Sequence, residues 1–232
     1  RVSISTVLQA YGVLENNGGI QALPQSGGYV RAVHTQLAPE PKVSKPSTSP
    51  CFVGVSAMVA TTLAARKQPG MVPLGEACPS PDLLPAAKLR RILSSLAARH
   101  PAILTTYGFP PGNEKLRRQI ARRAVASGCR LRSDDIIITN GCMEALNLCL
   151  RAVAKAGDTI ALESPTYYGL LQIIESLGMK ALEIPTHPRD GISLEALELA
   201  TRKRAVKACV VMANVSNPLG SIMPDEHKAR LA

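Results

Sequence analysis

Short apolar runs alternate with amphipathic helical patterns from about residue 71 onward, and this alternation constrains the fold more than any other feature. Four apolar, strand-like runs are expected at residues 135–139, 158–163, 179–184 and 206–213. Helical spacing predicts helices between them at 141–155, 167–177 and 193–203, and before them at 81–100 and 113–128. This order predicts an α/β fold with a mostly parallel sheet covered by helices on both faces. Ligands bind such sheets beyond the carboxyl ends of the strands.

The first 34 residues follow a different pattern. Apolar residues at helical spacing predict a helix over residues 3–17, with Ser3 capping its first turn. Two short strands, 20–23 and 28–32, are expected to form a hairpin around a turn at residues 25–27. A Pro, Ser and Thr-rich stretch follows, which is typical of an extended linker. The sequence therefore predicts three segments: a helix-and-hairpin unit at 1–34, a linker at 35–70, and an α/β domain at 71–232.

Composition narrows the function classes. Aromatic residues make up 3% of the chain and Trp is absent, so recognition of single-stranded nucleic acid by base stacking is disfavoured. The net charge of +10 is uneven, because Lys and Arg outnumber Asp and Glu by 17 to 5 up to Arg132, against 10 to 12 afterwards. A basic first half suits a phosphate-bearing partner, and a solvated positive surface explains the charge equally well.

The six cysteines form no C-x-x-C pair and have no His at metal-ligand spacing. This pattern disfavours a zinc site and a disulfide framework, and we interpret the cysteines as small core residues in a reducing compartment. The uncharged stretch at 51–65 is shorter than the ~20 apolar residues that span a bilayer. A cytoplasmic protein with no membrane partner is therefore expected.

The stretch "IIITNGCMEALNL", residues 136–148, places Asn-Gly between a strand-like run and a helix. Asn140 is expected to cap the helix, and Gly141 lets the backbone approach a ligand closely. The free N–H groups of Gly141, Cys142 and Met143 would then face a place where an anion is stabilised by the helix dipole. A phosphate is the natural ligand, although many such turns hold only water. The sequence lacks G-x-G-x-x-G and the P-loop pattern, which disfavours a dinucleotide or a nucleoside triphosphate.

Two further strand ends carry polar or aromatic groups. "SPTYYG" follows the run at 158–163 and presents Tyr167, a flat ring able to stack on a planar ligand. "NVSNPLG" follows the run at 206–213 and presents the amide side chain of Asn217. A phosphate site, a stacking ring and an amide at successive strand ends make one candidate site.

Four motifs, "YGFPPGNEKLRRQIA", "IIITNGCMEALNL", "ESPTYYG" and "NVSNPLG", occur in the order found in fold-type I pyridoxal-phosphate enzymes, and the chain resembles the first half of their large domain, in the aminotransferase class I/II family. The resemblance implies that Gly141 to Met143 hold the phosphate of pyridoxal 5'-phosphate, and that Tyr167 stacks on its ring. It implies that Asn217 hydrogen-bonds the 3-oxygen of the ring. Tyr107 matches a Tyr that reaches the phosphate of the neighbouring subunit, which implies a homodimer.

In that family the Schiff-base Lys, the acid at the pyridinium nitrogen and the Arg for the substrate carboxylate all follow the Asn-Pro-x-Gly motif. This sequence ends twelve residues after Gly220 and contains none of the three, so no catalytic residue is assigned. Both ends look truncated, since the chain begins without Met and stops inside a helical pattern. We therefore expect these 232 residues neither to transaminate nor to hold the cofactor as a Schiff base.

The stretch "VSISTVLQAYGVLENNGGIQALPQSGGYV" resembles the recognition helix and wing of GntR-type winged-helix regulators. The resemblance implies that Ser3, Ser5 and Thr6 contact duplex DNA in the major groove. It also implies that the wing, at Gln25, Ser26 and Gly27, touches the DNA backbone. The family often has Arg after the capping Ser, and here Ile4 replaces it, so a guanine contact there is lost. The alternative is a helix and hairpin that only pack against another domain.

A winged helix, a linker and an aminotransferase-like domain in this order resemble the MocR subfamily of GntR regulators. The resemblance implies a DNA-binding transcription regulator whose second domain binds pyridoxal phosphate, and an amino-acid-like effector, and joins two subunits. Two alternatives stay open: a metabolic aminotransferase with an N-terminal extension, and a non-functional gene fragment that does not fold stably.

Overall fold

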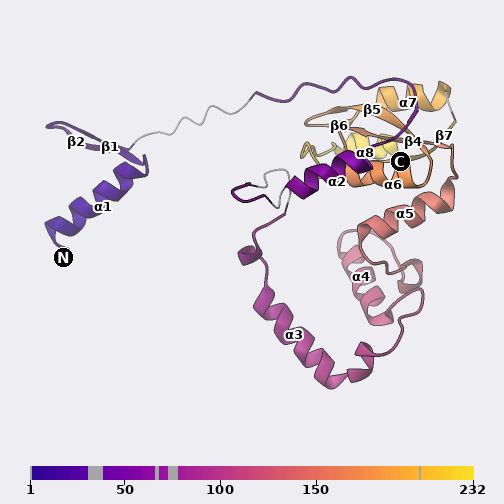
Figure 1. Cartoon of the computed structure of the whole chain (residues 1–232), viewed down its shortest axis with the longest axis horizontal. Helices are drawn as coiled ribbons and strands as arrows, with labels where there is room; N and C mark the ends of the chain where they lie inside the picture. The colour runs from indigo at the N-terminus through magenta and orange to yellow at the C-terminus, as the bar shows by residue number, and fades with distance from the viewer. Residues whose placement is uncertain (1, 31–38, 66–67, 73–77, 204) are drawn as a thin grey trace. The chain divides into compact units, whose positions relative to one another are not determined.

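The computed structural model describes residues 2–30, 39–65, 68–72, 78–203 and 205–232. They divide into two compact units, Arg1–Pro41 and Lys42–Ala232, and each unit is described by itself (Figure 1).

The first unit is one helix and one hairpin, as the sequence predicts. Helix α1 spans Ile4–Asn16, and strands β1 (Ile20–Leu23) and β2 (Gly27–Val30) pair antiparallel. Strand β2 begins one residue earlier than expected, and its expected end at 31–32 lies outside the described residues. The carboxylate of Glu15 accepts a hydrogen bond from the N–H of Ala22 at 3.2 Å, which ties the helix to the hairpin.

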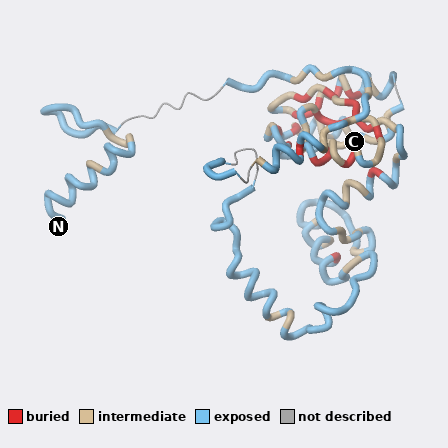
Figure 2. Tube along the Cα trace, viewed as in Figure 1, coloured by how far each residue is buried: buried red, intermediate tan, exposed pale blue. Residues whose placement is uncertain are grey.

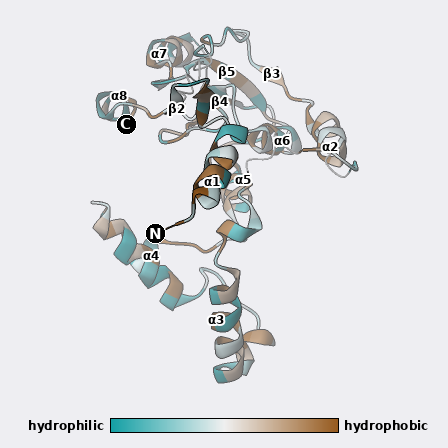
Figure 3. Ribbon diagram, turned by 90° about the vertical axis from the view of Figure 1, so that its left-hand side faces the viewer, coloured by the Kyte–Doolittle hydropathy of each residue, from teal (hydrophilic) through white to brown (hydrophobic). Residues whose placement is uncertain are grey.

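None of the residues of α1 is buried, and its apolar residues lie on the surface (Figures 2 and 3). Leu8 is 65% exposed and Tyr11 is 54% exposed. An amphipathic helix normally buries such a face against a neighbouring element. The described residues of the first unit supply no such element beyond the hairpin.

The second unit is built on a mixed sheet with strand order β3-β5-β4-β7, and β6 also pairs with β5. The strands span Cys51–Phe52 (β3), Thr159–Ser164 (β4), Lys180–His187 (β5), Gly191–Ile192 (β6) and Val206–Val210 (β7). Strand β4 is central and runs parallel to both β5 and β7, whereas β3 and β6 pair with β5 antiparallel. The carboxyl ends of β4 and β7 therefore lie at the same edge of the sheet.

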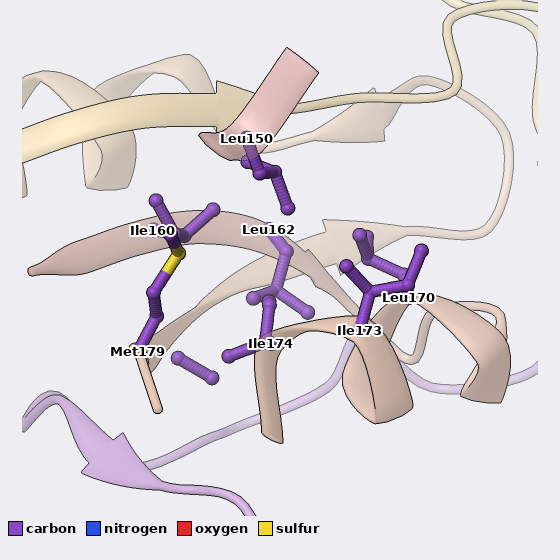
Figure 4. Packing of buried hydrophobic residues seen from close by; sticks show 8 residues of the cluster. Leu150, Ile160, Leu162, Leu170, Ile173, Ile174 and Met179 are labelled. Atoms are coloured by element: carbon purple, nitrogen blue, oxygen red, sulfur yellow. The ribbon is translucent and has the colours of Figure 1, made fainter. Parts of the chain in front are cut away.

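Helices cover both faces of this sheet, which confirms the predicted α/β architecture. Helices α5 (Cys142–Val153) and α6 (Tyr168–Ser176) pack on one face through a cluster of Leu150, Ile160, Leu162, Leu170, Ile173, Ile174, Met179 and Ala181 (Figure 4). Helices α7 (Leu194–Lys203) and α8 (Asp225–Leu231) pack on the other face through a second cluster, which includes Ala161, Leu182, Ile184 and Leu197. Ile160 and Leu162 lie in the first cluster and Ala161 lies in the second. This alternation is typical of a strand that is buried on both faces.

The region between β3 and β4 is helical but loosely packed before α5. It contains α2 (Ser56–Ala65), α3 (Ala86–Arg99), α4 (Glu114–Ala126) and 3-10 turns at Pro81–Leu83, Pro101–Leu104 and Ser133–Asp135. No residue of α3 is buried, and its apolar Leu93 is 66% exposed (Figure 2). The two helices that the sequence predicts at 81–100 and 113–128 are thus present, without the packing that the sheet region has.

The predicted strand at 135–139 is wrong. Residues 133–135 form a 3-10 turn, and 136–139 are extended without a sheet partner among the described residues. The N–H of Ile138 instead donates to the carbonyl oxygen of Pro111 at 2.9 Å. A β-branched run favours extended backbone, but a strand also needs a paired neighbour, and no described strand pairs with residues 136–139.

The predicted linker at 35–70 contacts the second unit over much of its described length. The hydroxyl of Ser44 donates to the carbonyl oxygen of Ser164 and accepts from the N–H of Thr186. Strand β3 adds to the sheet, and Glu175 accepts hydrogen bonds from the N–H groups of Val55 and Ser56 at 2.9 and 3.0 Å. The contacts divide the chain after Pro41, and the boundaries at 34 and 70 stay predictions.

All six cysteines are exposed, which corrects their assignment to the core. Cys209, for example, lies on β7, and the outer edge of that strand pairs with no other described strand. No helix among the described residues is both long and apolar enough to span a bilayer.

Candidate functional site

The amino end of α5 is an open set of backbone donors. Gly141 is the N-cap, with φ +93° and no side-chain cap, so the expectation that Asn140 caps the helix is wrong. The N–H of Asn140 donates to the carboxylate of Glu144. Within the described part of the chain, no hydrogen-bond acceptor is recorded for the N–H groups of Gly141, Cys142 and Met143. Free amides at the start of a twelve-residue helix stabilise an anion.

The ring of Tyr167 lies beside this helix end. Tyr167 follows β4 and caps α6, and Gly169, two residues further on, leaves space for two side chains at once. A Cβ on Gly169 would lie 2.4 Å from Cε1 of Tyr167 and 2.9 Å from the methyl of Met143. The ring of Tyr167 and the side chain of Met143, in the first turn of α5, therefore both lie against Gly169. This close approach explains why the motif has glycine there.

Tyr167 is partly shielded from water. Desolvation raises the pKa of its hydroxyl, and the neighbouring Tyr168 and the thiol of Cys142 raise it further. The rings of Tyr167 and Tyr168 lie 4.7 Å apart between centroids at 47°. The phenol of Tyr167 is thus neutral at physiological pH, and its ring is held by the packing around it.

Asn217 lies at the same sheet edge, in a loop after β7 that is fixed by its own hydrogen bonds. The hydroxyls of Ser216 and Ser221 are 2.6 Å apart, and the N–H of Ser221 donates to Ser216 at 3.1 Å. The N–H of Asn217 donates to the sulfur of Met212 at 3.1 Å, and the residue is exposed. Because β4 and β7 are parallel neighbours, Asn217 and Tyr167 follow adjacent strand ends. No direct contact between Asn217 and Tyr167 is recorded.

Tyr107 stands apart from this group, with 89% of its surface exposed. Its segment is anchored further along the chain at Gly112, where the backbone has φ +99°. A Cβ at Gly112 would lie 2.6 Å from Cβ of Ile138, so glycine is needed for this close approach. The structure thus brings together Tyr167 with Met143 and the end of α5, and leaves Tyr107 free on the surface.

A buried carboxylate at the same end of β4 escaped the sequence analysis. Glu163 is 4% exposed, and one of its oxygens accepts from the N–H of Met212 at 2.9 Å. Its other oxygen is buried without a partner among the described residues. Desolvation raises the pKa of this carboxyl, which the hydrogen bond only partly offsets. An acid inside the apolar run "TIALES" was the available signal, because a buried strand rarely carries one without a role.

In the first unit the predicted DNA-contacting hydroxyls meet at the start of α1. The side chain of Ser3 accepts from the N–H of Thr6 at 3.2 Å, and its hydroxyl lies 2.7 Å from that of Ser5. The hydroxyls of Ser3 and Thr6 are 2.8 Å apart. All three residues are exposed.

The predicted wing is a tight turn. Gln25 has φ +62° and Gly27 has φ +97°, which are turn conformations that favour Gly and amide residues. The hydroxyls of Ser26 and Tyr29 are hydrogen-bonded across the turn. The six residues assigned to DNA therefore lie on two exposed ends of the first unit, the start of α1 and the tip of the hairpin.

Residues 71–232 match the family described as aminotransferase class I and II. The chain belongs to this family. Among solved structures, an archaeal alanine:glyoxylate aminotransferase superposes with a TM-score of 0.68 at 25% identity, covering 77% of this chain and 45% of that one. An α-aminoadipate aminotransferase from Thermus thermophilus, complexed with N-(5'-phosphopyridoxyl)-L-leucine, gives a TM-score of 0.60 at 25% identity, covering 67% and 39%.

Relatives of this member of the aminotransferase class I and II family include regulators that match it almost from end to end. The HTH-type transcriptional regulator YdcR of Escherichia coli K12 is 40% identical over 99% of this chain, and YjiR of the same strain is 40% identical over 98%. YcxD of Bacillus subtilis strain 168, also an HTH-type regulator, is 25% identical over the full chain. The chain spans about half the length of these relatives, 49%, 48% and 46% respectively. The resemblance to MocR-type regulators is confirmed.

Proposed function

We propose that this chain is part of a DNA-binding transcription regulator whose aminotransferase-like domain binds pyridoxal 5'-phosphate as a ligand rather than for metabolic turnover. The observation that carries the proposal is the 40% identity to two HTH-type regulators, which extends over both units and not only over the aminotransferase part. The proposal includes a cytoplasmic location and a homodimer.

Family membership and the solved neighbours imply pyridoxal phosphate, and the described residues fit it. The unpaired amides of Gly141, Cys142 and Met143 suit the phosphate dianion, and they need no side chain for this role. The ring of Tyr167 offers a flat face for the pyridine, and the exposed carboxamide of Asn217 offers a donor for its 3-oxygen. Tyr107 is exposed enough to reach the phosphate of a second subunit.

In this mechanism the chain's own residues bind and orient the ligand. The amides at the start of α5 fix one end of the cofactor, and Tyr167 restricts the tilt of its ring. The bound cofactor supplies an electrophilic aldehyde able to react with amines. An amino compound is therefore the class of effector that we propose, and its arrival would change how two DNA-binding units sit on their half-sites.

DNA binding is tested with the full-length protein and the duplex upstream of its gene. The variant Ser5→Ala, Thr6→Val removes two groups that we place on bases, and each lost base contact costs about 1–3 kcal/mol. Asn16→Ala, at the other end of α1, is the matched control. We expect fluorescence anisotropy to show binding weakened by at least about tenfold for the first variant and unchanged binding for the control. Equal affinity of all three proteins would contradict the proposed contacts between α1 and the bases.

The second candidate is a metabolic aminotransferase, which the likeness to solved aminotransferases favours. Turnover of an amino acid with a keto acid by the full-length protein, without affinity for its upstream DNA, would select this function. Binding to that DNA, with an affinity that changes on addition of pyridoxal phosphate, would select the regulator.

A further inference from the structure

The net positive charge of the chain resides in one segment. Residues 86–132 contain eleven Lys and Arg and one acidic residue, Glu114, which equals the net charge of +10. The remaining 185 residues hold sixteen charges of each sign. The segment forms α3, α4 and the turns beside them, all within the second unit.

The segment that forms α1 and the hairpin, in contrast, has no cationic side chain for phosphates. Residues 2–30 contain no Lys, Arg or His, and they include one acid, Glu15. Phosphate neutralisation by Lys and Arg supplies most of the affinity of a protein for duplex DNA. A chain that reads DNA through α1 and the hairpin therefore needs cations from elsewhere.

Helix α4 presents such cations on one face. Arg117 is 9% exposed, and its guanidinium donates to the carbonyl oxygen of Ser133 at 2.7 Å, which fixes the inward face of the helix. Lys115, Arg118 and Arg122 follow at i, i+3 and i+7 on the opposite side, and all three are exposed. We call these three residues the α4 basic stripe. Figure 3 shows α4 with both hydrophilic and hydrophobic residues along its length.

Among the described carboxylates, one forms an ion pair with this stripe. Asp134 and Asp135 pair with Arg117 and Arg132, at 3.4 and 3.2 Å. Glu114 pairs with Arg118 across one helical turn, and both side chains are more than half exposed. Such an exposed pair contributes at most ~1 kcal/mol, so a phosphate competes with it readily.

For Lys115 and Arg122 no ion pair with any described carboxylate is recorded. The stripe extends over two helical turns, about 10 Å. Duplex DNA carries one negative charge per ~1.7 Å of its axis, so several phosphates fall within that reach. Stripe and duplex are therefore matched in charge and in dimension.

We propose that the α4 basic stripe binds the phosphate backbone of duplex DNA, as a contact without base preference that adds to the base reading by α1. This inference rests on the proposed DNA-binding function. It assigns a direct role on DNA to the aminotransferase-like unit, in addition to ligand binding. In this proposal α1 and the hairpin select the sequence, and the α4 basic stripe contributes electrostatic affinity.

The test uses the full-length protein and its Lys115→Gln, Arg118→Gln, Arg122→Gln variant. The matched control is Arg202→Gln, Lys228→Gln, Arg230→Gln, which removes the same charge from cations of α7 and α8 that are already paired with carboxylates. Affinity for the upstream duplex and for a scrambled duplex of equal length is measured across a series of salt concentrations. Circular dichroism and sedimentation check that fold and subunit number are unchanged.

We expect the slope of log affinity against log salt to fall by about 2–3 for the stripe variant, since each phosphate contact contributes ~0.9. Affinity at about 0.15 M salt then falls by roughly 30- to 100-fold on both duplexes alike. The control variant keeps the wild-type slope. An unchanged slope, an equal loss in the control, or a loss that accompanies dissociation of subunits overturns the inference while leaving the proposed function in place. Failure of the wild-type protein to bind either duplex overturns both.

Discussion

The sheet region, residues 159–187, and the helical region, residues 86–139, both carry many apolar side chains but differ in how far they bury them. Strand β4 and helix α6 bury almost every apolar side chain, whereas α3 buries none. In the first region parallel strands bring distant parts of the chain together, so each apolar face meets another within the unit. In the second region the apolar faces of the helices have no matching surface among the described residues. The comparison teaches that apolar side chains are buried where neighbouring strands and helices supply a facing surface, and stay exposed where the described residues supply none.

The largest expected difference between the two regions is in core stability. Leu162→Ala removes a fully buried side chain between β4 and α6, and such a change costs about 2–5 kcal/mol. Leu93→Ala on the exposed face of α3 should cost less than about 0.5 kcal/mol in an isolated chain. Urea unfolding of both variants measures the difference. If Leu93→Ala destabilises the full-length protein as much as Leu162→Ala does, the helical region is packed by another part of that protein.

The next effect concerns cofactor binding beyond the carboxyl end of β4. Gly169→Ala places a methyl group where the ring of Tyr167 and the methyl of Met143 already lie. We expect the displaced ring to weaken pyridoxal phosphate binding by about tenfold, equivalent to ~1.4 kcal/mol. Cofactor absorbance in the full-length protein gives the affinity. Gly54→Ala is the control, since no atom lies within 4 Å of its Cβ position, and a similar loss there would refute a local cause.

A smaller effect on stability is expected from the buried carboxyl group of Glu163. Burial raises the pKa of Glu163 above its ordinary value of 4.5, so the protonated form stabilises the fold. Its contribution is fully present below pH 4.5 and is lost as pH rises through the higher folded-state pKa. Glu163→Gln, which is neutral at every pH, should therefore be more stable than wild type at about pH 8. Unfolding at about pH 8 and about pH 5 checks this, and a gain that grows toward low pH would have the wrong sign.

The smallest effect on global stability is expected where the predicted linker meets the sheet region. Hydrogen bonds from Val55 and Ser56 lower the pKa of Glu175, so its charged form fastens the start of α2. This attachment is present above the ordinary pKa of 4.5 and weakens as pH falls through the lowered value. Glu175→Gln should speed hydrogen exchange over residues 51–65 at neutral pH and leave the unfolding midpoint nearly unchanged. Unaltered exchange in that segment would show that the carboxylate does not hold α2.

Sequence reasoning located most of the elements because their signals are local. Helical spacing found α1 and α4 to within a few residues, and Ser3 caps α1 in the structure as expected. It failed at residues 136–139, because pairing of a strand depends on which neighbours are available and not on its own residues. It also misjudged the six cysteines, since their exposure follows from which edges and faces remain uncovered.

For the candidate site, the sequence predicted the residues but not all of the contacts between them. The contact of Tyr167 with the start of α5 depends on Gly169, whose role emerges only when α5 and α6 are seen packed together. The N-cap of α5 is Gly141 and not Asn140, and Glu144 accepts a hydrogen bond from the N–H of Asn140, a pairing that spacing does not reveal. The burial of Glu163 was not predicted, because it depends on how the rest of the fold covers β4.

The central claim is that the amides of Gly141, Cys142 and Met143 bind the phosphate of pyridoxal phosphate. Hydrogen exchange at these amides in the full-length protein, with pyridoxal phosphate, with pyridoxal and without ligand, tests it most directly. We predict slower exchange at Cys142 and Met143 with pyridoxal phosphate and little change with pyridoxal, which lacks the phosphate. Equal protection by the two ligands, or no protection by either, would contradict the claim.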